Sequence, residues 1–273
     1  MVKVSVVIPV YNQKRFLCGA VGSALAQDAE KELIIIDDAS PDGAGVFLFE
    51  RLLAKFPVRI QKDTAEEKRL SVTAYGMTTE VSIVLLPQNG GVSAARNLGT
   101  KLAAGEYVAF LDADDRFRKG KLAAQLARME GSDAAFCCTG RRMLSYDGKP
   151  TGHEIGTPER ITEQTLHHGN CVNCSSVLIR RELMLAYPME HDEVHEDYLT
   201  WLRILSDHPY AAGIDEALID YRSSARGKSG SKVKSLGMNL KTFRVAGYGR
   251  IKSFIMLCGY IVGGIKKYMP KKH

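Results

Sequence analysis

The sequence predicts an α/β fold in which helices flank a sheet that contains buried parallel strands. Three short apolar runs predict buried strands at residues 4–10, 33–36 and 107–115, the first of them rich in β-branched residues and the last broken by three carboxylates. Between the first two runs, apolar residues recur on one helical face over residues 15–27. Such a strand, helix, strand unit is right-handed in open parallel sheets, and ligands bind beyond the carboxyl ends of its strands. With 273 residues, 45% of them hydrophobic and 25% charged, the chain can bury a large core.

The later elements alternate in the same way. Helical patterns occur at residues 46–56, 89–102, 119–129, 180–185 and 196–205. Strand-like runs occur at residues 58–60, 81–86, 134–138 and 172–179. Gly105 is expected to end the helix that precedes the run beginning at Tyr107, because glycine is common just after the last turn of a helix.

Three carboxylates end the apolar run that begins at Tyr107. Asp112 and Asp114 are two residues apart, so their side chains leave the same face while the backbone stays extended. Mg²⁺ and Mn²⁺ prefer oxygen ligands and are commonly held by one or two carboxylates together with substrate phosphates. The pair therefore predicts a site for a divalent cation, although an isolated Asp-x-Asp is more often a solvated turn after a strand.

Other polar side chains follow the neighbouring strands or open helices. Tyr11 comes after the first strand and Asp37 and Asp38 close the second, so they should gather with Asp112 at one edge of the sheet. A turn-forming role is the alternative for Asp38. Arg96 lies one turn into a helix, where it can serve an anionic group or form a surface ion pair.

Glu196 and Asp197 open the helix that carries Tyr198, Trp201 and Leu205 on one face. Acids in a first turn are favoured by the helix dipole and need no catalytic reason.

Five blocks of the chain, in this order, resemble the family 2 glycosyltransferases. They are VVIPVYN at 6–12, IIIDDASPDG at 34–43, NGGVSAARNLG at 89–99, FLDADD at 110–115 and ED at 196–197. Together they cover about residues 2–222 and are far more specific than any one block. The resemblance implies a GT-A fold over residues 1–225, which is a Rossmann-like nucleotide-binding mixed sheet flanked by helices.

The resemblance also implies an inverting glycosyltransferase with a nucleotide-sugar donor. Residues that would line the nucleotide pocket are Pro9, Tyr11, Asp37, Asp38 and Arg96. UDP is the expected nucleotide, and a hexose or N-acetylhexosamine the expected sugar.

By the same resemblance, Asp112 and Asp114 would be the DxD motif that holds Mn²⁺ or Mg²⁺ against the donor diphosphate. Asp197 would be the catalytic base. The cation would neutralise charge on the departing nucleoside diphosphate, while the carboxylate accepts the proton of the attacking hydroxyl. A single base on the side opposite the leaving group implies direct displacement with inversion.

We therefore expect an enzyme that extends a glycan or a lipid-linked saccharide. A sugar nucleotidyltransferase is one alternative, but it should carry a Gly-rich loop with Arg or Lys after the first strand, which residues 11–15 lack. The other alternative is an inactive relative that acts as a membrane assembly factor. The intact Asp112, Asp114 and Asp197 argue against that alternative.

Residues 61–80 lengthen the chain between two predicted strands beyond what is usual in the family. We expect an extra hairpin or a mobile flap there. It would contact the acceptor or a partner, or be a tolerated surface insertion.

The carboxyl-terminal part, residues 226–273, predicts a basic, amphipathic helical extension. It carries twelve Lys and Arg residues and no acid, whereas the rest of the chain has 25 basic and 31 acidic residues. Its unbroken apolar stretch, residues 254–265, is too short to span a bilayer but suits the interface. We expect residues 239–272 to contact an anionic membrane surface. A helix packed on the catalytic domain or on a second subunit is the alternative.

Two further expectations concern partners and location. Too few aromatic residues accompany the basic residues of the tail to suggest nucleic-acid binding. Six cysteines without a signal peptide indicate a reducing compartment. Together with the tail, these observations predict a cytoplasmic protein attached peripherally to the inner face of the cell membrane.

Residues 222–231 resemble the flexible loop that often closes over the donor diphosphate in the family.

Overall fold

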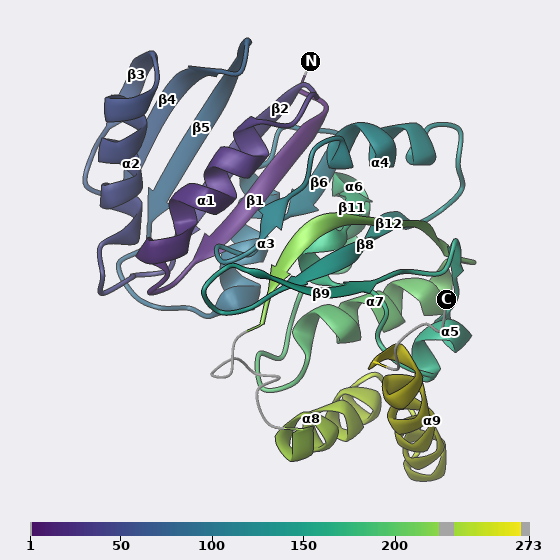
Figure 1. The fold of residues 1–273 in the computed structure, drawn as a ribbon. Helices are drawn as coiled ribbons and strands as arrows, with labels where there is room; N and C mark the ends of the chain where they lie inside the picture. The colour runs from purple at the N-terminus through teal and green to yellow at the C-terminus, as the bar shows by residue number, and fades with distance from the viewer. Residues whose placement is uncertain (1, 224–231, 269–273) are drawn as a thin grey trace.

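The computed structural model of the protein describes residues 2–223 and 232–268 (Figure 1). Within these residues, twelve strands form one mixed sheet. The strands are β1 (Val4–Val10), β2 (Lys31–Asp37), β3 (Val58–Asp63), β4 (Glu67–Ala74), β5 (Met77–Leu85), β6 (Tyr107–Phe110), β7 (Arg116–Phe117), β8 (Phe136–Leu144), β9 (Pro150–Ile155), β10 (Arg160–Ile161), β11 (Leu178–Arg180) and β12 (Ala211–Arg222).

Helices cover both faces of this sheet (Figure 1). They are α1 (Lys14–Leu25), α2 (Ala44–Lys55), α3 (Val92–Leu102), α4 (Lys121–Met129), α5 (Glu163–His167), α6 (Arg181–Ala186), α7 (Glu196–Asp207), α8 (Lys232–Val245) and α9 (Arg250–Tyr268), with a short 3₁₀ helix η1 (Cys174–Ser176). Leu17, Leu48 and Leu122 of α1, α2 and α4 belong to one hydrophobic core cluster, and Trp201 of α7 belongs to a second.

β1 lies inside the sheet, where it pairs in parallel with β2 on one side and with β6 on the other. The order along the sheet is β10-β12-β8-β11-β6-β1-β2-β5-β4-β3. β11 runs antiparallel to both β6 and β8 and so joins the two halves. The predicted α/β class with a mixed sheet is therefore confirmed.

The elements predicted in the first half of the chain are present. The strand predicted at residues 4–10 is β1, and the run at 33–36 lies within β2. Pro9 does not end its strand, because it pairs in register with Ile36 and β1 continues to Val10.

Gly105 does not end a helix, so that expectation is wrong. α3 stops at Leu102, and a Cβ atom at position 105 would lie 2.7 Å from the backbone nitrogen of Ser5. Glycine is therefore needed at this position for close approach of two backbones.

Residues 61–80 adopt the hairpin form. β4 pairs antiparallel with β3 and with β5, which extends the sheet at the edge formed by β3. The β3 strand is almost entirely exposed, and a register shift between Ile60 and Lys62 interrupts its pairing.

The carboxyl-terminal extension forms two helices, α8 and α9, that lie beside α7 and α5 (Figure 1). Phe243 and Met256 are buried, and both belong to the core cluster that contains Trp201. One face of the extension thus packs on α7 and α5, as in the alternative interpretation. The opposite face exposes Ile251 (80%), Phe254 (63%) and Ile255 (63%).

No helix among the described residues is both long and apolar enough to cross a membrane. The predicted boundary at residues 225/226 and most of the predicted donor loop fall within residues 224–231, outside the described part of the chain.

Candidate active site

The strand register brings the predicted site residues to one edge of the sheet. Val10 is level with Asp37, the last residue of β2, and Val7 is level with Phe110, the last residue of β6. Tyr11 directly follows β1, and Asp112 comes two residues after β6. The carboxyl ends of the three parallel strands therefore meet at one edge, as predicted.

Asp112 and Asp114 lie on a turn and not on an extended strand, which corrects the prediction of their geometry. β6 ends at Phe110, and the backbone N–H of Asp115 donates to the carbonyl oxygen of Asp112 at 3.0 Å. Their carboxylates are nevertheless close together. Burial and the neighbouring Asp112 raise the pKa of Asp114 to about 6.

The third carboxylate, Asp115, is buried and holds this turn in place. It accepts hydrogen bonds from the Ser175 hydroxyl at 2.6 Å and from the backbone N–H of Arg222 at 3.0 Å. The same hydroxyl accepts from the backbone N–H of Asp112 at 3.1 Å. Burial and the nearby carboxylates of Asp114 and Asp112 raise the pKa of Asp115 well above its ordinary range. Ser175 was not found from the sequence because it lies in an unremarkable apolar segment.

Arg96 joins the turn of Asp112 and Asp114 to the acidic pair at the start of α7. Its Nη2 atom donates to Asp112 at 2.6 Å and its Nη1 atom to Glu196 at 3.0 Å. The guanidinium is 4% exposed, so the ion pairs are buried and not the surface pairs considered as an alternative. Burial acts to lower the pKa of Arg96, but the carboxylates of Asp112 and Glu196 raise it well above the ordinary value.

Asp197 lies in the first turn of α7 and is partly buried. Its pKa is raised to about 7, mainly by burial and then by the neighbouring carboxylate of Glu196, while the guanidinium of Arg96 acts to lower it. The carboxylate of Asp112 also raises the pKa of Asp197. The two acidic motifs are therefore within electrostatic range of each other.

α3 holds the loop that leads to Asp197. The backbone N–H of Ser93 donates to Asp192 at 3.2 Å, and the Ser93 hydroxyl donates to the same carboxylate. Asn97 makes a reciprocal pair with the backbone of Met189, at 2.7 and 3.0 Å. The sequence carried a signal for this contact, because Ser93, Arg96 and Asn97 are polar and lie on one helical face.

Asp37 and Asp38 are both buried and both bind backbone N–H groups. Asp38 accepts from Gly90 at 2.7 Å and from Gly91 at 2.9 Å. Asp37 accepts from Gly45 at 2.7 Å and also from Ser40. These carboxylates therefore shape the loops around the site, and their contact with a nucleotide stays a prediction.

The other two residues predicted to line the nucleotide pocket differ in exposure. The Tyr11 side chain is 50% exposed at the end of β1, whereas Pro9 is buried inside the sheet. Only the tyrosine ring is thus free to stack on a base.

The donor set at the turn fits a hard divalent cation. Within the described residues, no group of three or more His, Cys, Asp or Glu side chains is arranged to hold a metal ion. Two carboxylates with ligands from a bound diphosphate would complete the coordination of Mg²⁺ or Mn²⁺. The raised pKa of Asp114 reflects buried negative charge that such an ion would offset.

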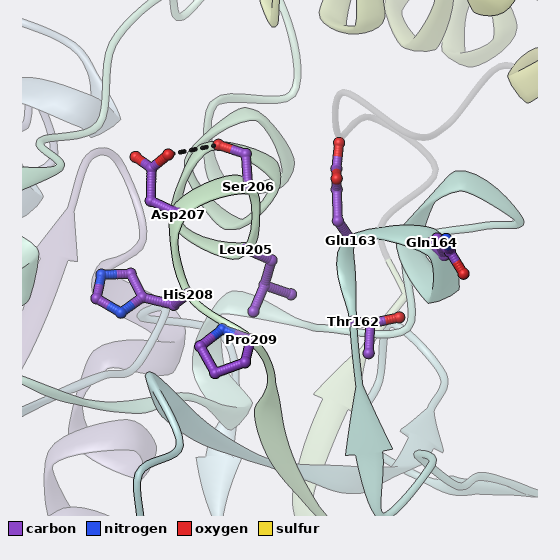
Figure 2. Close-up of a pocket in the computed structure, with 8 residues that line it drawn as sticks. All are labelled: Thr162, Glu163, Gln164, Leu205, Ser206, Asp207, His208 and Pro209. Atoms are coloured by element: carbon purple, nitrogen blue, oxygen red, sulfur yellow. Dashed lines mark hydrogen bonds between the residues drawn. The ribbon is translucent and has the colours of Figure 1, made fainter.

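A cavity of about 560 Å³ lies elsewhere, between the start of α5 and the end of α7 (Figure 2). Its lining residues are Thr162, Glu163, Gln164, Leu205, Ser206, Asp207, His208 and Pro209. With a rise of 1.5 Å per residue, the two ends of α7 are about 17 Å apart. Asp197 is at the other end, so this cavity is not part of the candidate active site.

Comparison with known proteins agrees with this arrangement. Residues 5–185 match the profile described as Glycosyl transferase family 2. TuaG of Bacillus subtilis (strain 168), named as a teichuronic acid biosynthesis glycosyltransferase, is 32% identical over 233 residues, covering 85% of this chain and 83% of TuaG. WfgD of Escherichia coli, a UDP-Glc:α-D-GlcNAc-diphosphoundecaprenol β-1,3-glucosyltransferase, is 27% identical over 97% of this chain and 94% of its own length.

Solved structures share the fold. Staphylococcus aureus TarS in complex with UDP-GlcNAc superposes with a TM-score of 0.64 at 17% identity, over 97% of this chain and 73% of that one. The mannosyltransferase PcManGT from Pyrobaculum calidifontis, in complex with GDP-Man and Mn²⁺, gives 0.67 at 15% identity, over 95% and 69% of the two chains. At these identities the likeness shows the fold alone, which is that of the GT-A glycosyltransferases.

Proposed function

Because the chain belongs to glycosyl transferase family 2, we propose that it moves a sugar from a UDP-sugar to a hydroxyl group of a lipid-linked or cell-surface glycan. The observation that carries this proposal is the double ion pair of Arg96, with Asp112 at 2.6 Å and with Glu196 at 3.0 Å. This one side chain joins the DxD turn to the start of α7. The two acidic motifs therefore belong to a single reaction site.

Asp197 is the proposed catalytic base. With a pKa of about 7, its carboxylate can accept a proton near neutral pH and release it afterwards. Glu196 raises the pKa of Asp197 and Arg96 lowers it, so the double ion pair of Arg96 helps to set the basicity of the site. Attack by the acceptor hydroxyl from the side opposite the diphosphate inverts the anomeric carbon.

Asp112 and Asp114 would hold Mn²⁺ or Mg²⁺ together with the donor diphosphate. Such an ion neutralises the charge of the departing nucleoside diphosphate. The role of the protein is to present the two carboxylates. Asp115 and Ser175 hold the turn in shape, and Arg96 fixes the orientation of Asp112.

The nucleotide is proposed to lie beyond β1 and β2. The exposed ring of Tyr11 would stack on the base. Pro9, Asp37 and Asp38 would form the floor beneath the nucleotide, and Arg96 would add positive charge at its edge. The structure of TarS with UDP-GlcNAc supports UDP as the nucleotide and a hexose or N-acetylhexosamine as the sugar.

The nature of the acceptor is proposed from the relatives. TuaG is named for teichuronic acid biosynthesis, and the name of WfgD specifies a GlcNAc-diphosphoundecaprenol acceptor. Both names concern glycans of the bacterial cell surface, which supports a role in building such a glycan on a lipid carrier.

Peripheral attachment to the inner, cytoplasmic face of the cell membrane is proposed for the tail, residues 239–272. Ile251, Phe254 and Ile255 project from one exposed face of α9, at the spacing of a helical surface. Arg250 and Lys252 flank them and would meet anionic headgroups.

A panel of UDP- and GDP-sugars tests the proposed activity. The purified protein is mixed with each donor, an undecaprenyl-diphosphate-linked sugar and Mn²⁺, and both nucleoside diphosphate and glycosylated lipid are measured. Transfer from one UDP-sugar that stops with EDTA is expected. Folded protein that transfers no sugar from any donor in the presence of lipid would refute the proposal.

A further inference from the structure

Arg141, in β8, is 9% exposed, yet its guanidinium has no charged partner among the residues that the structure describes. Its Nε atom is enclosed without a hydrogen-bond partner, and no ion pair links it to a carboxylate anywhere in the described residues. The ring of Tyr221 lies 5.6 Å from its Cζ atom. Burial without a counter-charge is unfavourable, because it removes the cation from water without compensation.

Other arginines near the site have partners within the fold. Arg96 pairs with two carboxylates, and Arg142 binds Asp220 through two hydrogen bonds at 2.8 and 2.9 Å. Arg222 donates to backbone carbonyl oxygens. Arg141 has no such partner in the part of the chain that the structure describes, so its guanidinium is available to a ligand.

The strand register puts Arg141 beside the metal-binding turn. Leu178 of β11 is level with Ala109 of β6 on one side and with Cys137 of β8 on the other. Asp112 is three residues beyond the first of these and Arg141 four beyond the second, so both lie toward the same end of these strands. Arg141 is still within the sheet, where it pairs with Ile219 of β12 and Ile155 of β9. At about 4.8 Å between neighbouring strands, β6 and β8 are about 10 Å apart across β11.

Tyr221 connects the guanidinium with the turn. The pKa of Tyr221 is raised, first by burial and then by the carboxylates of Asp115, Asp112 and Asp114. The guanidinium of Arg141 acts in the opposite direction and lowers this pKa. The ring is thus within electrostatic range of both the cation and the three carboxylates. Arg222, the neighbour of Tyr221, donates its backbone N–H to Asp115 at 3.0 Å, so the ring that contacts Arg141 belongs to a segment bonded to the turn.

The order of the strands decides which substrate occupies that space. Along the edge the order is β8, β11, β6, β1, β2, so Arg141 lies on the side of the metal site opposite the proposed nucleotide pocket. A donor with its nucleotide over β1 and β2 directs its sugar toward β11 and β8, where the acceptor must approach. We propose that Arg141 binds an oxyanion of the acceptor, a phosphate or a carboxylate, through paired guanidinium hydrogen bonds. This inference rests on the proposed function.

The test follows the Nε–H resonance of Arg141, identified as the signal absent from the spectrum of Arg141→Met. The protein is held with UDP and Mg²⁺ and titrated separately with N-acetylglucosamine 1-phosphate, glucuronic acid and N-acetylglucosamine. We expect the signal to shift with an anionic probe, whose affinity should be about tenfold or more above that of the neutral sugar. The probe that is bound distinguishes a phosphate from a carboxylate as the source of the oxyanion.

Two results would overturn the inference. A shift caused by UDP and Mg²⁺ alone, with no further change on adding the probes, would assign Arg141 to the donor. No shift with any probe would show that the residue binds no oxyanion. Because these readouts need no turnover, failure of sugar transfer would refute the proposed function without deciding the binding result.

Thermal unfolding supplies a second readout with a matched control. An anionic probe should raise the Tm of the wild type and of Arg142→Met, and leave that of Arg141→Met unchanged. Without a probe, Arg142→Met should lower the Tm because Asp220 loses its partner, whereas Arg141→Met should keep or raise it. An equal loss of Tm in both variants, with an equal response to the probe, would contradict the inference.

Discussion

The guanidinium of Arg96 lies 2.6 Å from the carboxylate of Asp112, in a position where it is 4% exposed. A second bond from the same guanidinium reaches the start of α7 at 3.0 Å. The relative position of the proposed metal-binding turn and the proposed base is therefore set by one buried cation between two acidic segments. Removing a partner from such a buried pair leaves uncompensated charge.

Arg96→Gln should lower the free energy of unfolding by about 3–5 kcal/mol, because Asp112 and Glu196 would lose their shared cation. Arg96→Lys should lose less free energy of unfolding, because it keeps the positive charge. It should still lose some, because lysine cannot bind both carboxylates in the same geometry. Urea unfolding at neutral pH measures both. The control is Arg203→Gln, whose exposed pair with Glu190 at 2.9 Å should contribute at most about 1 kcal/mol. Equal small losses in all three variants would contradict the structural role of Arg96.

Asp197→Asn should stabilise the metal-free protein above neutral pH. The folded-state pKa of Asp197 is raised to about 7, so its contribution to stability is complete below the unfolded pKa and is lost as the pH rises through 7. The amide mimics the protonated acid and keeps the hydrogen bond that Asp197 accepts from the backbone N–H of Tyr198.

We expect the free energy of unfolding of Asp197→Asn to exceed that of the wild type by about 1–2 kcal/mol at pH 8, after allowing for solvent screening. Near pH 4 the two proteins should have the same free energy of unfolding. Thermal or urea unfolding over this pH range provides the measurement. A gain of equal size at both pH values would show that the pKa of Asp197 is not raised.

Ser175→Ala should weaken metal binding, although Ser175 is not itself a proposed metal ligand. The hydroxyl donates to Asp115 at 2.6 Å and accepts from the backbone of Asp112 at 3.1 Å, so its loss frees the turn that carries the proposed metal ligands. We expect the apparent affinity for Mn²⁺, measured by titrating UDP binding, to fall by about 10–100-fold. Ser176→Ala is the matched control, because that hydroxyl donates to a nearby residue, to the carbonyl of Asn173 at 2.6 Å, and has no other hydrogen bond within the described residues. A similar metal affinity in both variants would exclude the positioning role.

Replacing Ile251, Phe254 and Ile255 by serine should abolish binding to vesicles that contain anionic lipid. These side chains are 80%, 63% and 63% exposed, so the Tm should change little while apolar area at the membrane is lost. Vesicle co-sedimentation measures the effect. Charge reversal at Lys252 should weaken binding mainly at low salt. Unchanged sedimentation of the triple variant would rule out this face of α9 as the contact.

Local periodicity was sufficient to predict much of the fold. The strands β1 and β2 and the helices α1, α2 and α7 occur where the spacing of apolar residues indicated them. β12 was missed because its alternation is broken by register shifts around Ala217 and by Asp215 and Glu216 at that point. Such bulges depend on pairing with β8, which has no local signal.

The acids of the site were found from the sequence, but their geometry was not. The end of an apolar run located Asp112 and Asp114, whereas the turn that brings them together depends on Asp115. The partners of that carboxylate, Ser175 and Arg222, are 60 and 107 residues away along the chain. Contacts between residues so far apart in the sequence form only in the folded sheet, so the spacing of residues within one segment could not reveal them.

The most direct test of the central claim separates the roles of the two acidic motifs. Calorimetric binding of UDP with Mn²⁺ and sugar transfer are measured for the wild type, Asp114→Asn and Asp197→Asn. We expect Asp114→Asn to lose Mn²⁺-dependent UDP binding, and Asp197→Asn to keep it while transfer falls by about 10²–10⁴-fold. Loss of UDP binding in Asp197→Asn, or full transfer by either variant, would contradict a single site in which one motif holds the metal and the other accepts the proton.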